Sequence, residues 1–207
     1  MLSAEEVRNM MISVSDAVIQ NESRLSEADR QLGDGDHGIG MTRGFTEVKK
    51  QFEALDPTSV SQVFTTAGMA LMSSMGGASG VVFGMLFQSG GMAIARAEGL
   101  NGESLAVFLE AGSQGVMNIG KAKPGDKTMI DALVPAAEAA KGAKDNSIQE
   151  ALAAAAKGAH QGMEASKDMI AQHGRARTLG DKCLGYPDAG AVSVSVIFQA
   201  ASDFVTT

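Results

Sequence analysis

The sequence lacks the features of secreted and membrane proteins. Its 207 residues include one cysteine, Cys183, so no disulfide can form within the chain. Residues 1–8 contain no basic segment followed by an apolar stretch, the usual pattern of a secretory signal. No apolar run approaches the roughly 20 residues that a membrane-spanning helix needs. We therefore expect a cytoplasmic protein without a membrane partner.

Positive charge and aromatic side chains are also scarce. There are 17 Lys and Arg residues against 24 Asp and Glu, which gives a formal net charge of −7. Nonspecific nucleic-acid binding needs clustered Lys and Arg, so we expect no nucleic-acid partner. Tryptophan is absent and Tyr186 is the only tyrosine. A core poor in aromatic residues suits close helix–helix packing, with methionine side chains filling irregular gaps.

Hydrophobic periodicity predicts helices along most of the chain. Ser3–Glu6 and Ser147–Glu150 have the capping-box pattern that opens a helix. The first of these helices is expected to run to about Asp29, and the second to about Gln172. The other helices are expected around residues 45–52, 60–71, 81–96 and 105–116, from about 127 with a bend at Pro135, and from about 188.

The last of these segments has two possible interpretations. Val192, Val194 and Val196 alternate with small residues, which is compatible with a strand as well as a helix. No other segment has a strand pattern, and no interior linker indicates a domain boundary. We therefore expect an all-α protein, a single domain over residues 1–207, built as a bundle or barrel of about eight antiparallel helices.

The strongest candidate site is a glycine-rich segment with three carboxylates. Asp29, Asp34 and Asp36 lie within eight residues, and the glycines between them allow a tight backbone turn. Carboxylate oxygens are the ligands of hard cations such as Mg²⁺, which takes its remaining ligands from water and substrate phosphates. The spacing does not fit an EF-hand loop. The alternative is a polar turn whose aspartates cap a helix.

A second candidate lies in the small residues of 73–80. Such residues at a helix start leave backbone N–H groups free to meet phosphate oxygens, and Ser79 adds a hydroxyl group. A loop that only allows two helices to pack closely would have the same composition. The segment is compatible with both interpretations.

Two other segments resemble phosphate-binding P-loops but fail on context. Gly115–Lys121 is followed by Ala122 instead of Ser or Thr, and no strand precedes it. Gly125–Thr128 lacks the upstream glycine at the required spacing. We interpret neither as a P-loop.

The chain offers no evident covalent nucleophile. Cys183 has no histidine at informative spacing, and His160 and His173 have no patterned partners, so we expect both histidines at the surface or at helix ends. His37 is the exception because it lies in the aspartate segment. Phosphate handling without a nucleophile suits phosphoryl transfer, in which positioning and charge neutralisation supply most of the catalysis.

The motifs, taken together, resemble those of the L subunit of dihydroxyacetone kinases (the DhaL family), which also occurs as the C-terminal domain of single-chain ATP-dependent enzymes. The resemblance covers essentially the whole chain and keeps the order of the family's motifs. The motifs that carry it are Gly33–Gly38, Gly76–Gly80, Pro124–Met129, Gly174–Ala176 and Asp188–Gly190.

The resemblance implies a barrel of eight antiparallel helices with a nucleotide, ADP or ATP, at one end. It implies that Asp29, Asp34 and Asp36 hold two Mg²⁺ ions that bridge the nucleotide phosphates. It assigns no catalytic residue, since the transfer is metal-assisted. The implied nucleotide contacts are His37, Ala78, Ser79, Gly120, Met129, Arg175, Asp188 and Gly190.

The resemblance further implies an enzyme subunit, a kinase acting on dihydroxyacetone or a related ketose such as erythrulose. The ketose is held on a separate K subunit, which agrees with the missing nucleophile. The phosphate comes either from exchangeable ATP or from a phosphotransferase-system phosphocarrier that recharges bound ADP. The competing interpretation is a nucleotide-loaded regulatory module that acts on a transcription factor or a scaffold.

Overall fold

The computed structural model describes residues 1–206, and nearly all of the regular structure in that range is helical. No strand occurs among the described residues, apart from one isolated antiparallel bridge between Leu2 and Leu100. Two 3₁₀ segments, Ser166–Asp168 and Arg175–Cys183, lie in the connection before the last helix. The α-helices are α1 (Ala4–Gln20), α2 (Glu22–Arg30), α3 (His37–Glu53), α4 (Val60–Ser74), α5 (Gly77–Ala93), α6 (Gly102–Gly120), α7 (Ile130–Gly142), α8 (Ile148–Ala165) and α9 (Ala189–Thr206).

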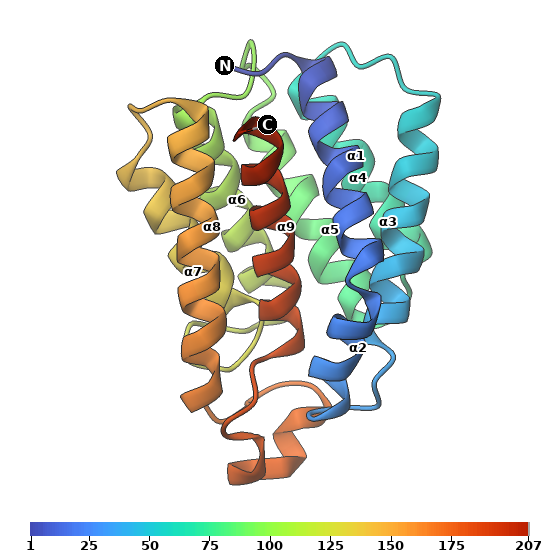
Figure 1. Ribbon diagram of the computed structural model, residues 1–207, viewed down its shortest axis with the longest axis vertical. Coiled ribbons are helices and arrows are strands. Elements are labelled where there is room, and N and C mark those ends of the chain that lie inside the picture. Colours follow the sequence, from blue (N-terminus) through green and yellow to red (C-terminus); the bar gives the residue numbers. More distant parts are fainter. Residues whose placement is uncertain (207) are drawn as a thin grey trace.

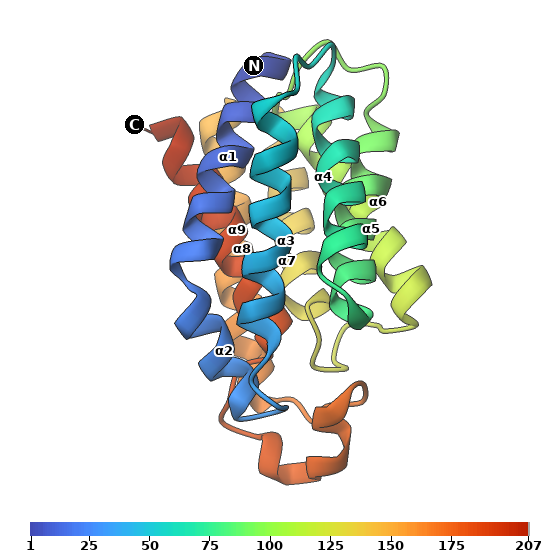
Figure 2. The same ribbon diagram turned by 90° about the vertical axis from the view of Figure 1, so that its right-hand side faces the viewer.

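The helices form a closed ring in which successive elements run up and down. Each of α3 to α8 packs against the next helix along the chain, and α1 closes the ring by packing against both α3 and α9. Helix α2 continues α1 at its lower end and packs against α3 and α9 (Figures 1 and 2). The prediction of an all-α barrel of about eight antiparallel helices is therefore confirmed.

The ring places one set of connections at one end of the barrel. Because the helices alternate in direction, the connections α2–α3, α4–α5, α6–α7 and α8–α9 all lie at the lower end in Figure 1. Both termini lie toward the opposite end (Figure 1). Segments far apart in the sequence are thereby brought together around one opening.

The predicted capping boxes are present. The Ser3 hydroxyl accepts a hydrogen bond from the Glu6 backbone N–H at 3.3 Å, and Ser147 does the same for Glu150 at 3.2 Å. Asn101 caps α6 in the same way by accepting from Ser104 N–H at 2.8 Å. Each cap satisfies backbone donors that a helix start leaves without partners.

The first helix is shorter than predicted. Instead of running to about Asp29, the chain breaks at Asn21, whose side-chain amide donates to the Ala17 carbonyl at 2.8 Å. Asparagine competes in this way with the backbone ladder and favours helix ends. The break gives α2 its own direction, and α2 carries Asp29 toward the barrel opening.

Three other helix ends differ from the predictions. Helix α5 begins at Gly77, four residues before the predicted start, so the small-residue segment forms its first turn. Helix α7 begins at Ile130 because Lys127 has a left-handed backbone with φ of 59°, and it continues through Pro135. Helix α8 ends at Ala165, not near Gln172, and a 3₁₀ turn follows.

The ambiguous last segment is a helix, so its alternating valines do not mark a strand. Val192, Val194 and Val196 are all buried because α9 packs against α1, α7 and α8. The length and composition of α9 would also fit a membrane span. However, 67 % of that window is buried against the other helices, as expected of a helix in a protein core.

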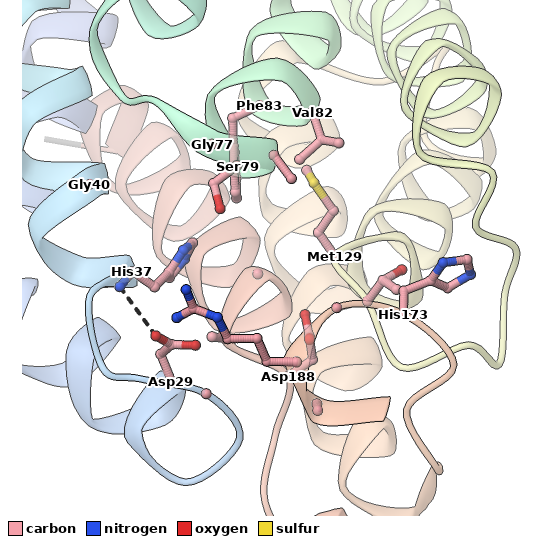
Figure 3. A pocket seen from close by; sticks show the side chains of 18 of the residues that line it. Asp29, His37, Gly40, Gly77, Ser79, Val82, Phe83, Met129, His173 and Asp188 are labelled. Carbon is pink, nitrogen blue, oxygen red and sulfur yellow. Dashed lines mark hydrogen bonds between the residues drawn. The ribbon is translucent and has the colours of Figure 1, made fainter. Parts of the chain in front are cut away.

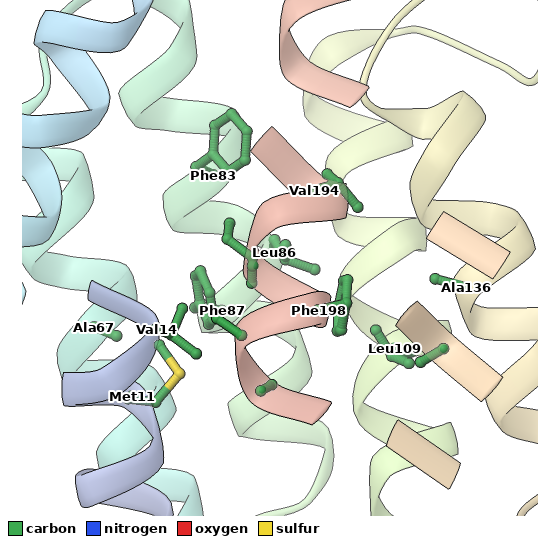
Figure 4. Close-up of a cluster of buried hydrophobic side chains, with 14 of the residues drawn as sticks. Met11, Val14, Ala67, Phe83, Leu86, Phe87, Leu109, Ala136, Val194 and Phe198 are labelled. Carbon is green, nitrogen blue, oxygen red and sulfur yellow. The ribbon is translucent and has the colours of Figure 1, made fainter. Parts of the chain in front are cut away.

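Phenylalanine side chains fill the centre of the barrel. Phe83 and Phe87 of α5 and Phe198 of α9 lie among aliphatic side chains from α1, α4, α6 and α7 (Figure 4). Phe64 and Phe108 pack with ring centroids 4.3 Å apart. Most of the eight phenylalanines therefore serve the core, and the polar residues of the lower connections are free to form a site.

Candidate functional site

The four lower connections surround a cavity of about 690 Å³. Side chains from α2, α3, α5, α7 and the segment before α9 point into it (Figure 3). The cavity brings together every residue that the sequence analysis singled out for metal or nucleotide. These residues are Asp29, Asp34, Asp36, His37, Ala78, Ser79, Gly120, Met129, Arg175, Asp188 and Gly190.

The three aspartates form a compact acidic cluster at one side of the cavity. One carboxylate oxygen from each of Asp29, Asp34 and Asp36 lies within 4.8 Å of the others. The turn that brings them together needs Gly35, which has a left-handed φ of 78°. Gly35 N–H donates to Asp29 Oδ2 at 2.9 Å, and His37 N–H donates to the same oxygen at 3.3 Å.

The other two carboxylates are less restrained. Asp36 precedes α3 but makes no side-chain capping bond to it, so its carboxylate does not simply cap the helix. Asp34 pairs with the Arg175 guanidinium, which comes from the 3₁₀ segment before α9. Three carboxylates this close repel one another, and the arrangement is stabilised by positive charge between them.

His37 links the acidic cluster to the barrel core. Its Nε2 forms a 2.8 Å hydrogen bond with Ser193 Oγ of α9, and its ring lies 6.1 Å from that of Phe83. Burial lowers the pKa of the His37 imidazole, while the nearby Asp29 charge partly opposes this effect. A neutral imidazole is therefore favoured at this position.

The opposite wall begins at the first turn of α5. Gly76 and Gly77 both have left-handed φ values, 74° and 62°, which few other residues adopt without strain. Gly76 provides no side-chain cap, so the first N–H groups of α5 are available to a ligand at the cavity. Ala78 and Ser79 of this turn line the cavity.

The α6–α7 connection, residues 121–129, forms a third wall. Buried Asp131 organises it by accepting from Gly125 N–H at 2.6 Å and from Thr128 N–H at 2.7 Å. No strand precedes either P-loop-like segment within residues 1–206, so both are correctly excluded. Lys127 and Thr128 nevertheless line the cavity.

Asp188 closes the cavity at the start of α9. Its carboxylate accepts from Ala191 N–H at 2.9 Å and so caps the helix. Burial raises the pKa of Asp188 to about 7, and neighbouring Asp131 adds to the rise while Lys127 opposes it. A carboxyl group next to the cavity therefore changes protonation near neutral pH.

The sequence analysis missed two contributors to the cavity and the partner of a third residue. Arg43 of α3 reaches across to donate to the Met75 carbonyl and lines the cavity. Lys127 was discounted together with the P-loop pattern. His173, expected at the surface or a helix end, is partly exposed, and its Nε2 lies 3.1 Å from Asp126 Oδ2 at the cavity edge. No spacing in the sequence links residues 47 positions apart, so only the fold reveals this pair.

The fold and cavity define a class of protein: an eight-helix barrel with an acidic cluster and an open helix N-terminus around one terminal cavity. Within that class, the family model described as the DAK2 domain matches residues 31–203. The chain belongs to the DAK2 domain family.

Curated relatives of similar length support this assignment. The chain is 36 % identical over 200 residues to the ADP-binding subunit DhaL of the PEP-dependent dihydroxyacetone kinase of Escherichia coli, covering 96 % of this chain and 95 % of that one. It is 38 % identical over 185 residues to the corresponding subunit of kinase 1 of Listeria innocua, covering 88 % and 87 %.

A solved structure has the same fold. The dihydroxyacetone kinase of C. freundii in complex with AMP-PNP and Mg²⁺ superposes with a TM-score of 0.74 at 27 % identity. The match covers 95 % of this chain but 33 % of that kinase, so the chain spans about a third of its length.

Proposed function

We propose that this chain is the nucleotide-binding subunit of a kinase, which passes the terminal phosphate of bound nucleotide to dihydroxyacetone or a related ketose. The observation that carries the proposal is the acidic cluster, three carboxylates within 4.8 Å, on the same cavity as the uncapped N-terminus of α5. One feature suits a divalent cation and the other suits phosphate oxygens. Relatives named as ADP-binding kinase subunits support the same function.

The donor set fits magnesium. Asp29, Asp34 and Asp36 present only oxygen ligands, and Asp29 uses Oδ2 for two backbone N–H groups, which leaves its Oδ1 free of those contacts. We propose that these carboxylates hold two Mg²⁺ ions. When bound, the ions supply charge neutralisation between the carboxylates and the nucleotide phosphates.

The chain's other cavity residues position the nucleotide. The first N–H groups of α5 and the Ser79 hydroxyl are placed to donate to phosphate oxygens. Arg175 brings a positive charge to the side of the cavity where Asp34 lies. The remaining proposed nucleotide contacts are His37, Ala78, Gly120, Met129, Asp188 and Gly190.

The ketose is supplied by another chain. The relatives of similar length are named as ADP-binding subunits of dihydroxyacetone kinases, which implies a further subunit. We propose a separate K subunit in the cytoplasm as the acceptor, with phosphate from exchangeable ATP or from a phosphotransferase-system phosphocarrier. Bringing donor and acceptor together contributes about 7–11 kcal/mol to lowering the barrier, so this chain alone is expected to be inactive.

Ketose phosphate formation tests the proposal directly. The assay compares this chain alone, a K subunit alone, and the mixture, each with Mg-ATP or with a phosphorylated carrier protein. We expect product only in the mixture, and loss of that product in Asp36→Asn but not in Asp145→Asn, an exposed aspartate in the α7–α8 turn. Full activity of this chain alone with ATP would contradict the need for a second chain, and no activity in any mixture would contradict the kinase function.

A further inference from the structure

Lys127, in the α6–α7 connection, is a lysine buried in an unusual way. It is 2 % exposed, and its backbone has a left-handed φ of 59°. Lysine is rarely buried without a partner, and a non-glycine residue in this conformation is strained. Both costs are tolerated only where the surrounding structure compensates for them.

The compensation comes from two carbonyl groups on the α8–α9 connection. Lys127 Nζ donates to the Ser166 carbonyl at 2.5 Å and to the Tyr186 carbonyl at 2.6 Å. These acceptors are 20 residues apart in sequence and stand at the two ends of the segment 167–185. The ammonium group therefore connects the start of this segment to its finish.

The two ends of the segment are also joined to each other. Gly185 N–H donates to the Lys167 carbonyl at 2.8 Å, and Asp188 N–H donates to Ser166 Oγ at 3.0 Å. Residues 167–185 thus leave the barrel and return at almost the same place (Figure 2). The segment is thus a surface loop whose ends are close together, and its position depends on the contacts that hold those ends.

Neighbouring charges and a second contact support the same attachment. Burial lowers the pKa of Lys127, and the nearby Asp188 and Asp131 oppose this effect by favouring its charged form. Next to Lys127, the Asp126 carbonyl accepts from Gln172 N–H at 3.0 Å. The connection 121–129 thus contacts both ends of the segment through Lys127, and contacts Gln172 and His173 within it through Asp126.

We propose that Lys127 is a positioning residue, which anchors the segment 167–185 against the α6–α7 connection and thereby holds Arg175 and Asp188 at the cavity. The contacts described above are sufficient to argue the anchoring. The expected effect on nucleotide retention rests, in addition, on the proposed function. Hydrogen exchange tests the anchoring, and the dissociation rate of Mg-ADP tests the effect on the nucleotide.

Hydrogen exchange measured by mass spectrometry tests the anchoring without any ligand. In Lys127→Met, amides of residues 167–187 are expected to exchange at least about tenfold faster, since two charge-assisted hydrogen bonds are lost. Exchange in α1 and α4 should stay within about twofold. The matched control, Lys144→Met, removes an exposed lysine from the opposite end of the barrel and should leave 167–187 unchanged. Equal rates in Lys127→Met and the unmutated protein, or a uniform rise in all helices, would overturn the proposal.

Replacement of Lys127 by arginine distinguishes hydrogen bonding by a cationic side chain from packing of its aliphatic part. Lys127→Arg keeps a positive charge and several N–H donors, so it should recover at least half of the lost protection on a logarithmic scale. Exchange as fast as in Lys127→Met would mean that hydrogen bonding to the two carbonyls is not what holds the segment.

A measurement on the unmutated protein covers the case in which Lys127→Met does not fold. Reductive methylation followed by peptide mapping should modify Lys127 at least about tenfold more slowly than exposed Lys144, because its ammonium is buried and engaged. Equal reactivity would overturn the anchor.

The dissociation rate of Mg-ADP is the functional readout. It should rise at least about tenfold in Lys127→Met with little change in the association rate, because a loosened wall affects retention more than entry. An unchanged dissociation rate despite faster exchange would show that the anchor does not serve the nucleotide. Absence of Mg-ADP binding in the unmutated protein would instead refute the proposed function and leave the exchange test intact.

Discussion

At the scale of single residues, the fold places ionisable groups where their protonation matters. Asp188 lies beside the cavity with Asp131 nearby, and burial raises its pKa from an ordinary value of 3.8 to about 7. A carboxyl group whose pKa is higher in the folded than in the unfolded protein binds more protons when folded. Stability therefore falls as the pH rises between these two values.

Asp188→Asn is expected to weaken this pH dependence. Asparagine is a comparable N-cap, so the Ala191 N–H keeps an acceptor while the titrating charge is removed. Urea unfolding from pH 4 to pH 8 should show that the free energy of unfolding of the variant, relative to that of the unmutated protein, rises with pH up to about pH 7. Identical pH profiles of the two proteins would contradict the raised pKa.

The sequence indicated some site residues but not others, for a physical reason. Asp29, Asp34 and Asp36 are close in sequence, so a glycine-rich turn alone brings them together. Contacts such as His173 with Asp126, or Lys127 with the Tyr186 carbonyl, join distant segments and depend on barrel closure. The local sequence pattern around each residue does not indicate which distant residue it contacts.

At the scale of elements, glycines determine how closely neighbouring helices approach. A Cβ atom at Gly162 of α8 would lie 2.0 Å from the Asp131 carbonyl oxygen of α7, and one at Gly158 would lie 2.4 Å from the Pro135 carbonyl oxygen. Backbone atoms cannot rotate away as a side chain can. Asp131, at this close approach of α7 and α8, also accepts the hydrogen bonds that organise the 121–129 connection.

Gly162→Ala should therefore destabilise the protein despite the better helix propensity of alanine. We expect a loss of about 1–3 kcal/mol in the free energy of unfolding, the usual cost of overpacking. Gly142→Ala is the matched control, since no atom lies within 4 Å of the added Cβ. Denaturant unfolding measures the free energy of unfolding of both variants. Equal values would contradict the claim that α7 and α8 lie too close for a Cβ atom at residue 162.

Element ends were the least predictable part of the fold. Hydrophobic periodicity and capping boxes predicted which segments are helical, and the seven segments predicted without an alternative are helical in the structure. The break at Asn21 and the early end of α8 arise from side-chain bonds to carbonyls, Asn21 to Ala17 and Ser166 to Met163. Periodicity continues across such breaks because both sides still face the same core.

At the scale of the whole molecule, the residues that stabilise the barrel and the residues that line the cavity occupy different parts of the structure. The centre of the barrel is filled by apolar side chains, while the lower connections carry the acidic cluster, the α5 N-terminus and Arg175. The closed ring follows from an even number of antiparallel elements of similar length. The assignment of residues 1–207 to a single domain, and the individual ligand roles of the cavity residues, stay predictions.

Calorimetric titration with ADP, in the presence of Mg²⁺ and again in EDTA, tests the central claim most directly. The account predicts binding by the unmutated protein and by Asp145→Asn with Mg²⁺, and no detectable binding in EDTA, because phosphates and carboxylates repel without a cation between them. Asp34→Asn and Asp36→Asn should lose at least about a hundredfold in affinity while circular dichroism shows the helical spectrum intact. Undiminished ADP affinity in EDTA, or in both variants, would contradict a metal-bridged nucleotide at this cluster.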